Sequence, residues 1–366
     1  MALSVGIVGL PNVGKSTLFN ALSNAGAEAA NYPFCTIDPN VGVVPVPDPR
    51  MDALVKLYEP LSVVPTTMEF VDIAGLVRGA SKGEGLGNQF LAHIRSVDAI
   101  CHVVRCFVDD NIIHVDGRID PASDMEVIDT ELMLRDLQSV EARRDRARKQ
   151  SKGGDAEEKH ALDVTERVWA ALERGVPVRA QGLSADDLAV LEPLSLLTGK
   201  PVLYVANVAE SAVTRDLDEP AVKPVLARAK AEGAEVVVIS AAIESEIATL
   251  DKADQREFLQ GVGLAEPGLH KLIRKAYALL DLVTFFTAGK QEVRAWTIRR
   301  GTAAPQAAGK IHTDFERGFI RAEVQRWNDL VELGSELAVK QKGLLRLEGK
   351  EYIVQDGDVV HFRFNV

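Results

Sequence analysis

The sequence is poor in cysteine and contains no long apolar run. Its three cysteines, Cys35, Cys101 and Cys106, form neither an even set nor a metal-binding spacing, so we expect buried thiols in a reducing compartment. No apolar run approaches the length that crosses a bilayer, and no basic stretch precedes the first apolar run, so no signal peptide is expected. These absences predict a cytoplasmic protein without a membrane partner.

Length and charge limit the function classes further. A chain of 366 residues is too long for one small core, which favours two or three domains. The hydrophobic fraction of 46% and the charged fraction of 26% are typical of globular proteins. The net charge of −11 argues against a protein that coats nucleic acid, so any contact with RNA is expected to be local.

The most informative stretch is GLPNVGKST, from Gly9 to Thr17. It follows the apolar run 3–8 and precedes the helix-like stretch 18–22, which gives a strand, a G-x-x-x-x-G-K-S loop and a helix. Such a loop curls its N–H groups around a phosphate, and the helix N-terminus adds partial positive charge. We expect Lys15 to reach the β- and γ-phosphates and the Ser16 hydroxyl to bind Mg²⁺. A chance glycine turn is the alternative, and the matching flanks disfavour it.

Two later segments have the positions of nucleotide switches. The loop 31–40 carries Thr36, whose hydroxyl and carbonyl would close over Mg²⁺ and the γ-phosphate; an ordinary turn threonine is the alternative. The strand-like stretch 68–71 ends in Asp72, which could hold Mg²⁺ through its water shell. Gly75, three residues later, could offer its N–H to the γ-phosphate.

The residue that orients the attacking water is not evident. Ras-like enzymes place a glutamine after the D-x-x-G glycine, whereas this chain has Leu76, which can do no acid–base or polar work. His114 follows the apolar strand-like run 99–107 on a polar loop, at the sheet edge where α/β proteins bind ligands. It is a candidate for positioning water or contacting phosphate, and an ordinary exposed loop histidine is the alternative.

The base-recognition motif departs from that of GTPases. After the apolar strand 201–206 the sequence reads Asn207-Val208-Ala209-Glu210, so Val208 replaces the lysine of N-K-x-D and Glu210 replaces the aspartate that binds guanine. The Asn207 amide can still accept from the adenine amino group and donate to N7, so we expect ATP to be favoured over GTP. Ser240-Ala241 follows another short strand and would form the base-side loop.

The remaining chain predicts a helical insertion and a β domain. Apolar residues recur at helical spacing on either side of the breaker 152–155, which predicts an antiparallel hairpin within 121–200. Its basic run, 143–152, is either a solvated face or a contact for RNA or an acidic partner. Short alternating segments over 283–366 predict a small β domain. Its stretch 290–326 has a net charge of +4 with aromatic residues, typical of an RNA surface or of an ordinary sheet with an aromatic core.

Several of these motifs together resemble the YchF (Obg-like ATPase) family of P-loop NTPases. The resemblance rests on Gly9 to Thr17, Asn31 to Asn40, Asp72 to Arg78 and the altered motif Asn207 to Glu210. The stretch from Phe286 to Phe315 resembles the start of a TGS domain, a ubiquitin-like β-grasp module of RNA- and ribosome-associated proteins. The resemblance implies an α/β P-loop NTPase domain of the Ras-like type over 1–282. It also implies a helical, coiled-coil insertion at 121–200 and a TGS domain over 283–366.

The resemblance also implies an activity. It implies a Mg²⁺-dependent ATPase of low intrinsic rate that tolerates GTP and associates with the ribosome or its large subunit, through the TGS domain and the insertion. Carried over by motif, Asn12, Val13, Gly14, Lys15, Ser16 and Thr17 would hold the phosphates, Ser16 and Thr36 the magnesium, and Asn207 and Val208 the base. Asn12 is also placed to hold a potassium ion, as in some relatives with an apolar residue after D-x-x-G. The alternatives are a nucleotide-gated ribosome-binding module with incidental hydrolysis, a GTPase, and, less favoured, a small-molecule kinase.

Overall fold

The computed structural model describes residues 3–27, 40–73, 86–109, 112, 118–153 and 155–365. The described chain divides into two compact units, the first formed by 3–27, 40–42 and 69–276, and the second by 43–68 and 277–365. None of the described helices is long and apolar enough to cross a bilayer. Cys101 and Cys106 are buried free thiols, as expected, and burial raises the pKa of each to about 12. Cys35 lies outside the described residues.

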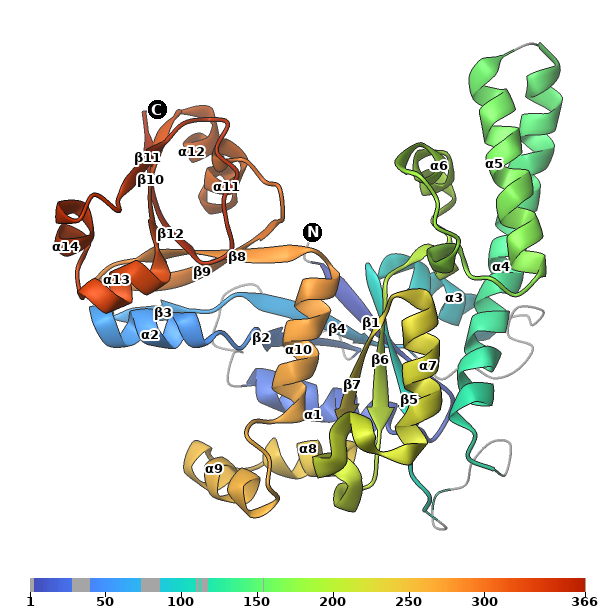
Figure 1. The fold of residues 1–366 in the computed structure, drawn as a ribbon, viewed down its shortest axis with the longest axis horizontal. Helices are drawn as coiled ribbons and strands as arrows, with labels where there is room; N and C mark the ends of the chain where they lie inside the picture. Colours follow the sequence, from blue (N-terminus) through green and yellow to red (C-terminus); the bar gives the residue numbers. More distant parts are fainter. Residues whose placement is uncertain are drawn as a thin grey trace. The chain divides into compact units, whose positions relative to one another are not determined.

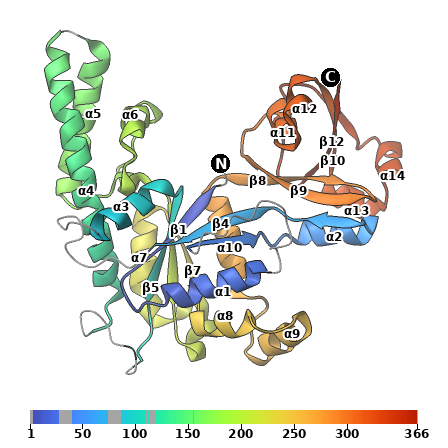
Figure 2. The ribbon, with the colours of Figure 1, turned by 180° about the vertical axis from the view of Figure 1, so that it is seen from behind.

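The first unit is built on a six-stranded sheet with the order β2-β4-β1-β5-β6-β7, and the boundary between the units falls within β2 and β4. Its strands are β1 (Ser4–Val8), β2 (Val41–Pro45), β4 (Thr67–Asp72), β5 (Ala99–Arg105), β6 (Val202–Asn207) and β7 (Glu235–Ile239). The pairs β1–β4, β1–β5, β5–β6 and β6–β7 are all parallel. Every residue of β1, β5 and β6 is buried, as expected of parallel strands covered on both faces. Figures 1 and 2 show helices around this sheet from opposite sides.

The helices of the first unit follow the expected α/β alternation. They are α1 (Lys15–Ala27), α3 (Leu86–Ser96), α4 (Pro121–Gln150), α5 (Ala156–Glu173), α6 (Ala185–Leu191), α7 (Lys223–Glu232), α8 (Ala241–Ile247), α9 (Lys252–Gly261) and α10 (Gly268–Leu279). Short 3₁₀ turns connect several of them, including η2 (Val178–Ala180), η4 (Leu197–Gly199) and η5 (Glu210–Asp218).

The loop between β1 and α1 has the backbone that its glycines allow. Gly14 has φ 97°, a conformation that side chains disfavour, and Asn12 takes the left-handed conformation at φ 61°. A Cβ on Gly14 would lie 2.4 Å from the Asn207 amide nitrogen, and one on Gly9 would lie 2.5 Å from the Val103 carbonyl oxygen. Close approach of neighbouring groups therefore requires glycine at both positions.

The expected helical hairpin is formed by α4 and α5, which lie side by side in both ribbon views (Figures 1 and 2). Asp120 caps α4 and Asp155 caps α5, each accepting a hydrogen bond from a main-chain N–H of the first turn. A buried apolar seam that includes Met133, Val140 and Val164 joins the two helices. The hairpin is thus held by ordinary core packing.

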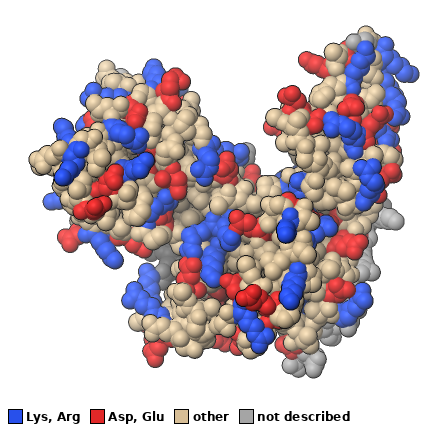
Figure 3. Space-filling view, viewed as in Figure 1, with Lys and Arg blue, Asp and Glu red and all other residues tan. Residues whose placement is uncertain are grey.

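Much of the basic run on α4 is used within the hairpin. Arg143 pairs with Glu158 at 2.9 Å, and Arg148 pairs with Glu166 at 3.0 Å. The guanidinium of Arg144 lies 4.4 Å from the centre of the Trp169 ring. Figure 3 shows both signs of charge over the hairpin on the face viewed. These contacts favour the solvated-face interpretation of the run over a dedicated anion-binding face.

Buried carboxylates fix the base of α4 to the rest of the first unit. Asp129 accepts hydrogen bonds from Arg179 at 2.7 Å and from Arg228 of α7 at 2.5 Å. Asp136, 1% exposed, accepts from the main-chain N–H groups of Leu197 and Thr198 at 2.8 and 2.7 Å. The insertion is therefore anchored at two levels, each supported by hydrogen bonds to a buried charge.

The second unit has its own six-stranded sheet, with the order β11-β10-β12-β8-β9-β3. Its strands are β3 (Ser62–Val64), β8 (Leu282–Ala288), β9 (Glu292–Arg299), β10 (Phe319–Arg326), β11 (Arg346–Glu348) and β12 (Asp358–Phe364). Its helices are α2 (Pro49–Tyr58), α11 (Ala304–Ile311), α12 (Thr313–Arg317), α13 (Trp327–Leu333) and α14 (Glu336–Gln341). Phe285 and Phe286 belong to separate hydrophobic clusters, so apolar side chains pack on both faces of the sheet.

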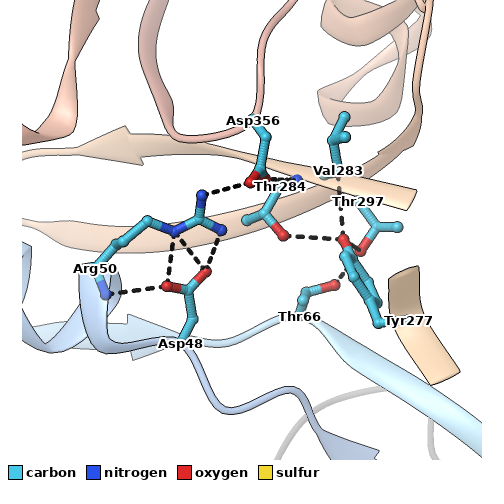
Figure 4. A network of polar contacts seen from close by, with 8 residues as sticks. All are labelled: Asp48, Arg50, Thr66, Tyr277, Val283, Thr284, Thr297 and Asp356. Atoms are coloured by element: carbon cyan, nitrogen blue, oxygen red, sulfur yellow. Dashed lines mark hydrogen bonds and ion pairs between the residues drawn. The ribbon is translucent and has the colours of Figure 1, made fainter. Parts of the chain in front are cut away.

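Residues 43–68 belong structurally to this second unit, which the sequence analysis did not anticipate. Strand β3 pairs in parallel with β9 at the sheet edge, and Met51 and Leu54 of α2 pack in one core with Phe286. Arg50, held by Asp48, donates to Asp356 at 2.8 Å (Figure 4). This segment therefore completes a sheet whose other strands lie more than two hundred residues later in the sequence.

The same close-up shows a second set of contacts in this unit. The Tyr277 hydroxyl donates to the Val283 carbonyl oxygen at 3.2 Å and is hydrogen-bonded to Thr284 and Thr297 at 2.9 and 3.0 Å (Figure 4). Thr297 is also hydrogen-bonded to Thr66. Threonine hydroxyls thus join the early segment to strands β8 and β9.

Candidate functional site

A cavity of about 640 Å³ opens at the carboxyl edge of the first unit's sheet. Four chain segments supply its walls, and each follows or adjoins the end of β1, β5, β6 or β7. Its lining residues are Asn12, Gly14, Lys15, Ser16, Thr17, Phe107, Val108, Asp109, Ile112, Asn207, Val208, Ala209, Glu210, Ser211, Ser240, Ala241 and Ala242. This is the edge at which parallel α/β sheets bind ligands, and the volume suits a small organic ligand.

One end of the cavity is built to receive an anion. Lys15, the first residue of α1, is 6% exposed, and its ammonium group donates to the Leu10 carbonyl oxygen at 2.6 Å. Burial lowers the pKa of Lys15 to about 8, while the Asp72 carboxylate acts in the opposite direction. Ser16 and Thr17 are exposed in the first turn of the same helix. The helix N-terminus and the lysine together form a phosphate-type site.

Asp72 ends β4 beside this loop, since its neighbour in the sheet is Ile7 of β1. Burial raises the pKa of Asp72, and the Lys15 charge opposes that shift. Its Oδ1 atom is buried and has no hydrogen-bond partner among the described residues. The described residues include no group of three His, Cys, Asp or Glu side chains that could hold a metal alone. A cation here would take oxygen ligands from Ser16 and a bound anion, with Asp72 acting through the water shell of the cation.

The Asn207 amide is hydrogen-bonded to the main chain of two loops. Its Nδ2 donates to the Val13 carbonyl oxygen at 2.9 Å, and its Oδ1 accepts from the Ala241 N–H at 2.9 Å. The side chain is buried, with 3% exposure. The protein's own main chain occupies one donor and one acceptor of this amide, which leaves one of each, and the expected pair with adenine stays a prediction. Asn207 joins the phosphate loop to the base-side loop.

The other residues predicted to contact the base, Val208, Glu210, Ser240 and Ala241, line the same cavity. Val208 is 2% exposed, and its main-chain N–H donates to the Ile239 carbonyl oxygen at 2.8 Å, so that N–H is not available to a base in this state. Glu210 is exposed at the start of η5. Ser240, 1% exposed, directly precedes α8, whose first residue is Ala241. An apolar side chain thus stands where a GTPase has its lysine stem.

Comparison with known proteins agrees with this geometry. A family model described as "50S ribosome-binding GTPase" matches residues 4–142, and one named YchF-GTPase_C, described as a protein of unknown function (DUF933), matches residues 282–365. The chain is 58% identical to "Ribosome-binding ATPase YchF" of Haemophilus influenzae, with all of both chains covered. It is 46% identical to "Obg-like ATPase 1" of Rattus norvegicus, covering all of this chain and 93% of that protein. This chain belongs to the YchF family.

A solved YchF structure shares the fold over the full length. The "Schizosaccharomyces pombe YchF GTPase" superposes with a TM-score of 0.89 at 40% identity, covering 99% of this chain and 97% of that one. The expected P-loop NTPase fold is therefore confirmed, together with a C-terminal YchF domain.

Several sequence candidates cannot be placed in this YchF protein. Thr36, Gly75, Leu76 and His114 lie outside the described residues. Conversely, the structure adds cavity-lining residues that sequence reasoning missed, namely Phe107, Val108, Asp109 and Ile112 with Ser211. The signal for the first four was available, because they follow a buried strand at the same sheet edge as the phosphate loop.

Proposed function

We propose that this YchF protein is a Mg²⁺-dependent ATPase that hydrolyses ATP to ADP and phosphate and associates with the ribosome under nucleotide control. The observation that carries the proposal is a cavity of about 640 Å³ that is lined both by a buried P-loop lysine and by the altered base motif at 207–210. The names of the relatives, which are ribosome-binding ATPases, support ATP as the substrate and the ribosome as the partner.

ATP is the preferred nucleotide in this proposal, although the Schizosaccharomyces pombe relative is named a GTPase. Guanine recognition needs a carboxylate that accepts from both guanine N–H donors and a lysine stem along the base. Here Val208 provides a buried apolar surface, and Glu210, one methylene longer than aspartate, is exposed. This wall can accept a purine ring and lacks the side chains that recognise the N–H donors of guanine.

Magnesium is the proposed metal, and two observations support it. The Ser16 side chain is exposed on the cavity wall, and the Asp72 carboxylate has a buried oxygen without a hydrogen-bond partner among the described residues. Oxygen ligands of this kind suit Mg²⁺, with phosphate oxygens and water completing its shell. Thr36 is the further proposed ligand. Asn12, in the left-handed conformation on the same wall, remains the proposed contact for potassium.

The chain's own groups would promote hydrolysis by electrostatics and positioning. The bound cation would offset charge on the phosphate oxygens. Lys15 would hold the β- and γ-phosphate oxygens, and the main-chain N–H groups of 12–17 would surround them. Gly75 would add its N–H to the γ-phosphate, and His114 would position the attacking water in place of a polar side chain at residue 76. A site that lacks a strong base in this way is expected to turn over slowly.

The proposed division of labour follows the chain. Residues 1–282, without the segment 43–68 that packs in the second unit, would form the nucleotide-binding domain. The insertion at 121–200 would form a coiled-coil arm, and 283–366 a TGS domain. The ribosome or its RNA would contact the C-terminal domain and the arm, in the cytoplasm. The local net charge of +4 over 290–326 supports the C-terminal part of this proposal, whereas the internal ion pairs of α4 and α5 weaken the case for the arm.

Phosphate release and ribosome co-sedimentation test the proposal together. We expect Mg²⁺-dependent release of free phosphate from ATP, lost on chelation and in the Lys15→Ala variant. Co-sedimentation with ribosomes should differ between ADP and a non-hydrolysable ATP analogue. A phosphorylated acceptor in place of free phosphate would contradict hydrolysis.

The Asp72→Asn variant distinguishes the two functions that were considered, a hydrolytic switch and a ribosome-binding module in which hydrolysis is incidental. If it loses turnover while its ribosome binding still responds to nucleotide, binding is the primary role and hydrolysis is incidental. If both are lost together, the hydrolytic switch is supported.

A further inference from the structure

Arg105 is a buried arginine beside the cavity that the proposed mechanism does not use. It is the last residue of β5 and is 1% exposed. A guanidinium cannot lose its charge inside a protein, so its burial must be compensated by hydrogen bonds. In the described part of the chain its recorded partners are three main-chain carbonyl oxygens.

All three acceptors lie in the segment that directly follows Arg105. Its Nε donates to the Phe107 carbonyl at 3.2 Å, Nη2 to the Asp109 carbonyl at 3.2 Å and Nη1 to the Ile112 carbonyl at 3.1 Å. The Phe107 ring also covers the guanidinium, at 4.6 Å from its central carbon to the ring centre. One side chain therefore fixes the path of the backbone at three points, whatever side chains that segment carries.

The residues fixed in this way form a wall of the cavity. Phe107, Val108, Asp109 and Ile112 all line it, together with the base-end segments 207–211 and 240–242. The main-chain N–H of Cys106 also donates to the Asn207 carbonyl at 2.8 Å, so the start of this wall is joined to the base motif. The Arg105 side chain itself is not among the lining residues.

We propose that Arg105 is a positioning residue that shapes the base end of the nucleotide cavity and thereby sets the preference between ATP and GTP. The inference rests on the proposed function, because it assigns the base to this end. Among the described residues, Arg105 forms hydrogen bonds with the wall segment and none with the phosphate loop or the Lys15 side chain. Its effect should therefore reach the base and leave the triphosphate unaffected.

The substitution Arg105→Lys keeps the positive charge and removes the planar guanidinium with its three donor nitrogens. A lysine ammonium is a single point donor and cannot reach three carbonyls spread over six residues in this geometry. The matched control is Arg179→Lys, which removes another buried guanidinium fork, bound to Asp129 and Glu232 away from the cavity. Arg105→Gln is a second variant, which brings no charge into the interior and can still donate to one carbonyl.

Three probes are titrated calorimetrically against each folded variant, namely non-hydrolysable ATP and GTP analogues and tripolyphosphate, each with Mg²⁺. For Arg105→Lys and Arg105→Gln we expect about tenfold weaker binding of the ATP analogue, a changed ratio between the two nucleotides, and tripolyphosphate affinity within about twofold of wild type. For Arg179→Lys we expect lower thermal stability with the nucleotide ratio unchanged.

An unchanged nucleotide ratio in the Arg105 variants, or a parallel loss of tripolyphosphate affinity, would overturn the inference and leave a purely structural arginine. If neither variant folds, the arginine Nε–H NMR signal in the wild-type chain decides. We expect the Arg105 signal to shift with the ATP analogue and not with tripolyphosphate, and the reverse would contradict the inference. A wild-type chain that binds neither nucleotide analogue would instead refute the proposed function.

Discussion

Lys15 can attract a triphosphate only while it carries its proton, and burial makes that proton easier to lose. Burial lowers the pKa of Lys15 to about 8, against the raising effect of Asp72. A bound triphosphate would raise this pKa again, because opposite charges stabilise one another. Phosphate affinity and protonation of this lysine are therefore linked.

The linkage predicts that nucleotide affinity is full below about pH 8 and falls as the pH rises above it, by up to about tenfold per pH unit. Near pH 8 the bound complex should also take up protons, so the calorimetric enthalpy should depend on the ionisation enthalpy of the buffer. The Lys15→Arg variant is the control, since arginine stays charged over this range. An identical pH profile in that variant would contradict the assignment to Lys15.

Asn207 supports the site through hydrogen bonds to the protein's own main chain. Replacing it with alanine leaves the Val13 carbonyl and the Ala241 N–H without their recorded partner, each at a cost of about 1–3 kcal/mol. We expect Asn207→Ala to lower the free energy of unfolding and to weaken ATP and GTP analogues by the same factor. Thermal unfolding and paired titrations measure both effects. A selective loss of the ATP analogue would instead show a direct contact with adenine.

The phosphate loop was predictable from sequence, whereas the main-chain hydrogen bonds of Asn207 were not. The glycine spacing, Lys15 and Ser16 act locally, between one strand and the next helix, so their pattern carries the information. The hydrogen bonds of Asn207 depend on two loops that lie far from it in sequence. A motif shows that an amide is present but not which groups already satisfy it.

At the scale of elements, His102 lies inside the layer where β5 faces α4 and α7. It is 3% exposed, and its ring centre lies 5.5 Å from that of Tyr204. Burial lowers the pKa of His102 to about 4; Asp129 raises it, and Arg179, Arg228 and Lys15 lower it further. The folded chain therefore holds this histidine neutral at a pH where the unfolded chain protonates it.

This difference in the pKa of His102 between the folded and unfolded chains predicts a loss of stability in acid. Between about pH 6.5 and about pH 4 the unfolded state binds more protons at His102, so stability falls as the pH falls, by up to about 3 kcal/mol. The variant His102→Phe keeps an aromatic ring against Tyr204 and should show a flatter stability profile over this range in denaturant unfolding. The exposed His160 on α5 serves as the control position. An unchanged profile in His102→Phe would contradict the prediction.

The helices of the hairpin were predictable because their apolar periodicity is local. The two anchors, Asp129 and Asp136, were not, because an acidic residue on a helix normally indicates a solvated face. Their partners come from η2, η4 and α7, far along the chain. Composition alone cannot show that a carboxylate is buried against main-chain N–H groups or arginines.

At the scale of the whole molecule, the chain contributes one early segment to its C-terminal unit. Residues 43–68 lie in sequence between the phosphate-loop helix and Asp72, yet they pack in the second unit. Strand β3 has only three residues, of which two are exposed, so it carries almost no local pattern. Long-range pairing of this kind is not encoded in any single stretch and could not be predicted.

Because residues 43–68 pack in the second unit, a core substitution in this segment is predicted to destabilise that unit. Leu54 is fully buried with Phe286 and Leu330, so Leu54→Ala should cost about 2–5 kcal/mol. Hydrogen exchange should rise in β8, β9 and β12 while β1, β5 and β6 stay protected. The matched control is Leu22→Ala in α1, which should show the opposite pattern. Increased exchange confined to the first unit in Leu54→Ala would contradict the division.

The most direct measurement is a pair of calorimetric titrations of the wild-type chain with non-hydrolysable ATP and GTP analogues in Mg²⁺. Lys15 and Val208 line the same cavity, and Val208 takes the place of the lysine that GTPases have in their base motif. This substitution predicts tighter binding of the ATP analogue. Equal affinities, or tighter binding of the GTP analogue, would contradict it.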